Sequence, residues 1–120
     1  MADARHAAGQ AAEQAAGRFL ESRGLTLVER NARFRLGEWD LVMLDGHVLV
    51  FVEVRLRRHR GYGGPLASVD WRKQRKLARA ALAWIQRNPS HGQRIQRFDV
   101  VGFSDLSAAP EWIRDAWRPA

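Results

Sequence analysis

The chain has 120 residues, with 20 Lys and Arg against 13 Asp and Glu, so its formal net charge at pH 7 is +7. This length predicts one domain spanning residues 1–120. The absence of cysteine excludes disulfides, thiol nucleophiles and cysteine-based metal sites. No apolar run approaches the ~20 residues of a membrane helix, so we expect a cytoplasmic protein without a membrane partner, and the positive charge favours nucleic acid as partner.

The N-terminal half predicts a helix followed by three strands. Residues 4–22 carry an apolar stripe at helical spacing and end just before Gly24, a residue typical of helix C-termini. Strands are predicted over residues 25–34, 38–44 and 47–57. The last two are joined by Asp45-Gly46, a dipeptide typical of tight hairpin turns.

The C-terminal half predicts a helix, a strand and a second, shorter helix. A glycine-rich loop at residues 58–67 precedes Ser68, which we expect to cap a helix that runs to about residue 87. A strand follows over residues 97–103, and Pro110 predicts the start of a short C-terminal helix that ends near Trp117. The order αβββαβ plus this helix predicts an α/β fold, a mixed β-sheet flanked by helices.

The predicted hairpin gathers acidic side chains on one face of the sheet. A two-residue turn at Asp45-Gly46 pairs Leu44 with His47. Because side chains alternate along a strand, one face then carries Glu38, Asp40, Glu53, Arg55 and Arg57. Asp40 and Glu53 become diagonal neighbours, roughly 7–8 Å apart at the backbone. The opposite face carries Val48, Val50, Val52, Val54 and Leu56 and is expected to be core.

Such a cluster of acids requires compensation, because like charges destabilise a strand pair and buried charges are costly. Arg55 and Arg57 could neutralise the acids in a structural salt-bridge network, and the spacing alone favours this interpretation. A hard divalent cation, which prefers oxygen ligands, is the alternative. Glu13, at the border of the apolar stripe of the first helix, is either a fourth acid near the sheet or simply a good helix former.

Several motifs together resemble a known family. Glu13, the GEWDL of residues 37–41 and the FVEVR of residues 51–55 resemble the YraN-type bacterial family. That family is grouped with archaeal Holliday junction resolvases in the PD-(D/E)xK nuclease superfamily. The resemblance continues into the C-terminal third and spans nearly the whole chain. It implies a restriction-endonuclease-like core, whose αβββαβ order agrees with the order predicted above.

The resemblance also implies an active site. Asp40 and Glu53 would bind Mg²⁺ or Mn²⁺, and Glu13 would complete the acidic site. The metal would polarise the scissile phosphate and supply a hydroxide. Arg55 stands where the family pattern has lysine. Arginine stays protonated, so Arg55 could contact the scissile phosphate but could not act as a base.

The implied function is a metal-dependent endonuclease that hydrolyses DNA phosphodiester bonds, with branched DNA as a candidate substrate. The alternative, motivated by Arg55, is a nucleic-acid-binding protein that has a nuclease fold and little or no catalysis. A third hypothesis is a basic structural protein, in which the acids and arginines simply pair within the sheet.

Two basic segments flank the acids and are candidates for binding phosphates. The candidate residues are Arg57, Arg58 and Arg60 of the loop and Arg72, Lys73 and Lys76 of the second helix. Tyr62 could stack on an unpaired base, or pack the loop onto the domain. A solvated surface is the alternative for the helix cations, and Lys73 is the one nearby lysine that could compensate for Arg55. The five tryptophans are expected to serve packing, with a homodimer contact as the alternative for Trp112 and Trp117.

Overall fold

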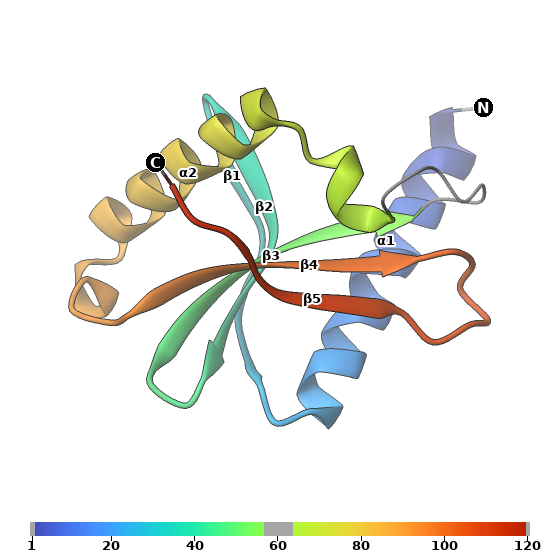
Figure 1. Ribbon diagram of the computed structural model, residues 1–120, viewed down its shortest axis with the longest axis horizontal. Coiled ribbons are helices and arrows are strands. Elements are labelled where there is room, and N and C mark those ends of the chain that lie inside the picture. Colours follow the sequence, from blue (N-terminus) through green and yellow to red (C-terminus); the bar gives the residue numbers. More distant parts are fainter. Residues whose placement is uncertain (1, 57–63, 120) are drawn as a thin grey trace.

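A five-stranded β-sheet lies between two α-helices in the computed structural model, which describes residues 2–56 and 64–119 (Figure 1). The elements are α1 (Ala2–Ser22), β1 (Thr26–Phe34), β2 (Gly37–Asp45), β3 (Val48–Leu56), η1 (Pro65–Ser68), α2 (Trp71–Arg87), η2 (Pro89–His91), β4 (Gln96–Phe103) and β5 (Glu111–Trp117). The strands are arranged in the order β1-β2-β3-β4-β5, and every neighbouring pair is antiparallel except β3–β4, which is parallel. No helix within the described ranges is long and apolar enough to cross a membrane.

Each face of the sheet is covered by one helix and has its own apolar core. On the α1 side, Val50 and Val52 pack with residues of that helix such as Leu20, which confirms the predicted core face of β3. On the α2 side, Phe51 packs with Trp84 of that helix. Because β3 is buried on both faces, its run of apolar residues is continuous rather than alternating, as is typical of a strand with a parallel neighbour.

The prediction of a C-terminal helix is wrong, because residues 111–117 form β5 and pair with β4. Asp115 adopts a positive φ of 50°, and the register of the strand shifts between its two pairings at Ile113 and Trp117. Trp112 packs on the α1 side and Trp117 on the α2 side, as expected for two residues that are five apart in a strand. Both indoles therefore contribute to the core of the domain, and a homodimer contact through them stays a prediction.

The hairpin between β2 and β3 turns one residue later than predicted. Asp45 pairs with Val48, so the turn is Gly46-His47, and Gly46 adopts the positive φ of 61° that this tight turn requires. The predicted pairing of Leu44 with His47 is therefore wrong, and Leu44 pairs with Leu49 instead. The register is shifted by two residues, which preserves the face of each side chain over the paired residues 41–45 and 48–52.

Candidate functional site

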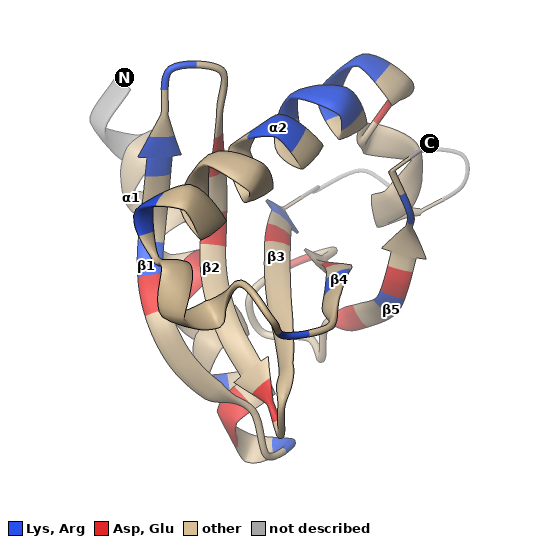
Figure 2. Cartoon of the chain, turned by 90° about the vertical axis from the view of Figure 1, so that its left-hand side faces the viewer, with Lys and Arg blue, Asp and Glu red and all other residues tan. Residues whose placement is uncertain are grey.

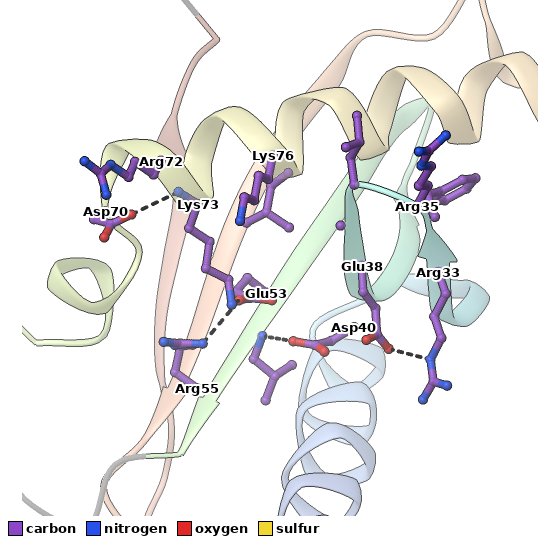
Figure 3. Close-up of a pocket in the computed structure, with 15 residues that line it drawn as sticks. Arg33, Arg35, Glu38, Asp40, Glu53, Arg55, Asp70, Arg72, Lys73 and Lys76 are labelled. Atoms are coloured by element: carbon purple, nitrogen blue, oxygen red, sulfur yellow. Dashed lines mark hydrogen bonds and ion pairs between the residues drawn. The ribbon is translucent and has the colours of Figure 1, made fainter.

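An open pocket of about 790 Å³ lies beneath the N-terminal half of α2, against the β1–β2 hairpin and β3 (Figure 3). Gly37 allows this close approach of the helix, because a Cβ there would lie 3.2 Å from the backbone oxygen of Lys76. The charged residues that line the pocket are Arg33, Arg35, Glu38, Asp40, Glu53, Arg55, Asp70, Arg72, Lys73 and Lys76. Six cationic side chains thus surround four acidic ones.

Asp40 lies where β2 diverges from β3. The paired residues of the two strands end at Leu41 and Val52, and Oδ2 of Asp40 accepts a hydrogen bond of 2.7 Å from the backbone N–H of Val54. The side-chain alternation of β2 also changes phase here, since Trp39 packs on the α2 side and Leu41 on the α1 side. The indole of Trp39 donates to the carbonyl oxygen of Leu77 on α2 at 2.9 Å. The carboxylate of Asp40 is thereby fixed between two strands.

Glu53 is buried, with only 3% of its surface exposed, and is held by two cations. Its Oε2 lies 2.8 Å from Nζ of Lys73 and 3.4 Å from Nη1 of Arg55. Lys73 reaches it from the first turn of α2, where the side chain of Asp70 accepts a hydrogen bond of 2.9 Å from the Lys73 backbone N–H. A lysine that the sequence placed on a basic helix is therefore in direct contact with a predicted metal ligand.

Arg55 is held in place by η1. Its Nε donates to Oγ of Ser68 at 2.8 Å, and its Nη2 donates to the carbonyl oxygen of Ser68 at 3.2 Å. Ser68 is therefore not the helix cap that the sequence predicted, and Asp70 has that role. Because the guanidinium is engaged by Ser68 and Glu53, Arg55 orients the Glu53 carboxylate, and its contact with a scissile phosphate stays a prediction.

Glu13 approaches the same cluster from α1. The side-chain amide of Asn31, with its nitrogen directed at both acids, donates to Oε2 of Glu13 at 3.0 Å and to Oε1 of Glu38 at 3.2 Å. Asn31 has a positive φ of 52°, a conformation that Asn tolerates better than most residues. Glu13 also interacts with the side chain of Asp40, so the structure brings these two acids together. The sequence carried no signal that would identify Asn31.

The pKa values of Glu13, Asp40 and Glu53 are all raised, which means that the folded protein disfavours their negative charges. Burial raises the pKa of Asp40 to about 6, and the charge of Glu13 adds to this, while hydrogen bonds with Glu53 and Val54 act in the opposite direction. Burial and then the charge of Asp40 raise the pKa of Glu53 to about 8, although Lys73 opposes the shift. Burial also raises the pKa of Glu13. The cluster therefore favours any cation that can replace its protons.

Within residues 2–56 and 64–119, the predicted salt-bridge network joins Arg55 to Glu53 and does not extend to Asp40, while Arg57 lies outside these ranges. Among the described residues, Asp40 forms no ion pair, although the pocket is rich in arginine and lysine. Neighbouring carboxylate oxygens without enough cationic partners are ligands that suit Mg²⁺ or Mn²⁺. No three or more His, Cys, Asp or Glu side chains within residues 2–56 and 64–119 are placed to hold a metal ion alone. Water and phosphate oxygens would have to complete the coordination of a bound ion.

The predicted phosphate-binding residues are only partly within the described ranges. Arg72, Lys73 and Lys76 all line the pocket. Arg33 and Arg35 of the β1–β2 hairpin line it as well and were not predicted from the sequence. These two arginines could have been identified as candidates because they closely precede the GEWDL motif of residues 37–41. Arg57, Arg58, Arg60 and Tyr62 lie outside the described residues.

Lys and Arg are concentrated in the N-terminal half of α2, and Arg87 adds one more at its C-terminal end (Figure 2). The sequence of this helix, WRKQRKLARAALAWIQR, contains no acidic residue. Helix α2 therefore presents a strongly positive surface beside the acidic floor of the pocket.

Comparison with known proteins gives a consistent result. Residues 12–103 match the model of the uncharacterised protein family UPF0102. A UPF0102 protein of Halorhodospira halophila is 52% identical over 110 residues, covering 92% of this chain and 86% of that protein. One of Xanthomonas euvesicatoria pv. vesicatoria is 52% identical over 118 residues, covering 98% and 97%. A third, of Alcanivorax borkumensis, is 47% identical over 112 residues, covering 91% and 90%.

Proposed function

The chain belongs to the uncharacterised protein family UPF0102, and we propose that this member is a metal-dependent endonuclease that hydrolyses DNA phosphodiester bonds. One observation carries the proposal. Asp40, next to Glu13 and Glu53, has no ion pair among the described residues, in a pocket that six cationic side chains line. In a purely structural network we would expect an arginine to turn towards Asp40. The order αβββαβ with parallel β3 and β4 adds support, because it is the order of the nuclease core that the sequence resembles.

In this proposal the acids hold the metal and the cations hold the substrate. Asp40 and Glu53 would bind Mg²⁺ or Mn²⁺, which when bound polarises the scissile phosphate and lowers the pKa of a water molecule. Arg72 and Lys76, at the wall formed by α2, would bind phosphates on either side of the scissile bond. The oxygen of a water molecule would bond to phosphorus, one ester P–O bond would break, and a proton of that water would pass, through solvent, to the leaving oxygen. The products are a phosphate monoester and a hydroxyl end.

Lys73 has a specific part in this proposal. The family pattern places a lysine at position 55, on the strand that carries Glu53, and this chain has arginine there. Nζ of Lys73, which comes from α2 instead, lies 2.8 Å from Oε2 of Glu53. An ammonium group at this carboxylate can orient water and stabilise the negative charge that develops on the phosphate. Lys73 would thus supply the group that Arg55, which is bound to Ser68, does not supply.

Cleavage assays test the proposal directly. Labelled linear, forked and four-way DNA would be incubated with the protein and Mg²⁺, Mn²⁺ or a chelator. We expect cleavage that requires metal and falls at least about 100-fold in Asp40→Asn, because loss of even a residue that only supports a metal ligand typically costs about 10- to 100-fold. Asp105→Asn is the matched control, because Asp105 is exposed and does not line the pocket. Failure of every substrate to react, or equal cleavage by Asp40→Asn, would refute the proposal.

The second candidate function is nucleic-acid binding with little or no catalysis. The observation that favours it is again Arg55, because arginine cannot accept a proton and this guanidinium is engaged by Ser68 and Glu53. Binding that weakens steeply with salt, without cleavage by either the wild type or Arg55→Lys, would support this function. The absence of measurable DNA binding would instead favour the basic structural protein.

A further inference from the structure

Trp71, the first residue of α2, is the exception among the tryptophans. Its surface is 60% exposed, whereas Trp39 and Trp84 are buried, and Trp112 and Trp117 are half-buried. The prediction that all five tryptophans serve packing is therefore wrong for Trp71. Single exposed apolar side chains are common on protein surfaces, so what distinguishes Trp71 is its surroundings.

Two arginines of the same helix flank the exposed indole. The guanidinium carbon of Arg72 lies 5.4 Å from the ring centroid of Trp71, and that of Arg75 lies 5.7 Å from it. These distances are within the range of cation–π contacts, which restrict the ring and add positive charge around it. The backbone below is fixed, because Asp70 caps the helix at this turn. The result is an ordered aromatic surface with a cationic border.

This surface adjoins the pocket. Asp70, Arg72 and Lys73 line the pocket, and Trp71 lies among them in the first turn of α2. Arg72 belongs to both features, since it lines the pocket and also contacts the indole. A strand whose phosphates lie in the pocket could therefore place a neighbouring base on Trp71.

We propose that Trp71, with Arg72 and Arg75, is a stacking platform for an unpaired DNA base next to the phosphate-binding pocket. A nucleic acid is the ligand that fits this surface. All charged residues of α2 are cations, which favours a polyanion, and aromatic rings stack on bases of any sequence. Bases inside a duplex are already stacked, so the platform favours single strands, forks and junctions. The proposal deepens the nuclease function and rests on it for the phosphates in the pocket.

Binding measured without divalent metal tests the platform independently of cleavage. Fluorescence anisotropy would compare labelled single-stranded, forked and blunt-ended duplex DNA. We expect Trp71→Ala to weaken binding of the first two by about fivefold to a hundredfold, the range for loss of one base–aromatic stack, and blunt duplex by less than about twofold. Trp71→Phe should retain most of the affinity. Leu82→Ala is the matched control, because Leu82 is 63% exposed on the same helix.

A second readout reports stacking itself. A 2-aminopurine placed at the unpaired position should lose fluorescence when it stacks on the wild-type protein, and should stay bright with Trp71→Ala. Equal affinities of wild type and Trp71→Ala for single-stranded DNA, or an equal loss on all three DNAs, would overturn the proposal. If cleavage fails while the Trp71 result holds, the platform belongs to a binding protein. If cleavage occurs and the Trp71 result fails, only the platform is rejected.

Discussion

Two groups of carboxylates in the same sheet differ in how their charges are satisfied. Asp99 of β4 is fully buried, and Oδ1 and Oδ2 accept hydrogen bonds from Arg97, from the indole of Trp112 and from the backbone N–H of Asp115. Arg97 also pairs with Asp45 at 2.9 Å. Around Asp40, by contrast, acids contact acids, and the nearest cations pair with Glu53.

The difference separates a structural network from a candidate site. At Asp99 every partner that a carboxylate needs is supplied by the fold, and those partners tie β5 to β4. At Asp40 the fold supplies one backbone N–H and no paired cation among the described residues. Buried ion pairs that are complete stabilise one conformation, whereas an incomplete cluster retains affinity for an external cation.

The largest expected effect is on stability at Asp99. Asp99→Asn should lower the free energy of unfolding by about 3 kcal/mol, because the buried carboxylate accepts hydrogen bonds from Arg97, Trp112 and the Asp115 backbone that a neutral amide cannot all replace. Asp40→Asn should stay within about 1 kcal/mol of wild type, because it relieves repulsion between acids. Urea unfolding at pH 7 measures both. A loss at Asp40 as large as that at Asp99 would contradict the distinction between the two groups.

The next effect is on the pH dependence of stability. The pKa of Glu53 in the folded protein is raised from 4.5 to about 8, so the native state holds this proton more tightly than the unfolded chain does. The resulting stabilisation is complete below about pH 4.5 and is lost as pH rises to about 8, a change on the order of a few kcal/mol. Without metal, Glu53→Gln should show a flatter stability profile between pH 5 and 8.5 by thermal unfolding. If the stability of the wild type did not change with pH over this range, the raised pKa of Glu53 in an uncompensated acidic cluster would be refuted.

Divalent metal should stabilise the protein by a somewhat smaller amount. Because Mn²⁺ or Mg²⁺ competes with protons for Asp40 and Glu53, the increase in melting temperature should be greater at pH 8 than at pH 6. At a metal concentration one hundred times the Kd, the stabilisation is about 2.7 kcal/mol. Asp40→Asn should lose it and Asp105→Asn should retain it. If metal raised the melting temperature of both variants equally, the metal would bind at a site that does not include Asp40.

The smallest effects distinguish two lysines of α2. Lys73→Gln should lower cleavage about 10- to 100-fold with little change in DNA affinity, since Lys73 acts at Glu53. Lys76→Gln should weaken DNA binding only a fewfold and reduce the dependence of log Kd on log salt by about one, as expected for a single phosphate contact. Single-turnover kinetics and anisotropy titrations measure the two quantities. If both variants behave alike, Lys73 is an ordinary phosphate contact.

The sequence by itself determined the periodic elements and the strand that carries each acid. Alternation along β2 and β3 was sufficient to place Asp40 and Glu53 on a common site, and this conclusion survived a register error of two residues because side-chain alternation has a period of two. The helices were predicted for the same reason, since their apolar stripes are a local property. The last strand was not predicted, because Pro110 resembles a helix start and the free edge of β4, with which the strand pairs, is not a local signal.

Only the tertiary structure decided which charges meet. The contact of Lys73 with Glu53, the bonds of Arg55 to Ser68 and the position of Asn31 between Glu13 and Glu38 each join different elements. Such contacts depend on how α1 and α2 dock on the sheet, which no pattern within one element encodes. The same docking leaves Trp71 in solvent beside the pocket while Trp84, on the same helix, is buried. Periodicity describes single elements, and a site forms where several of them pack.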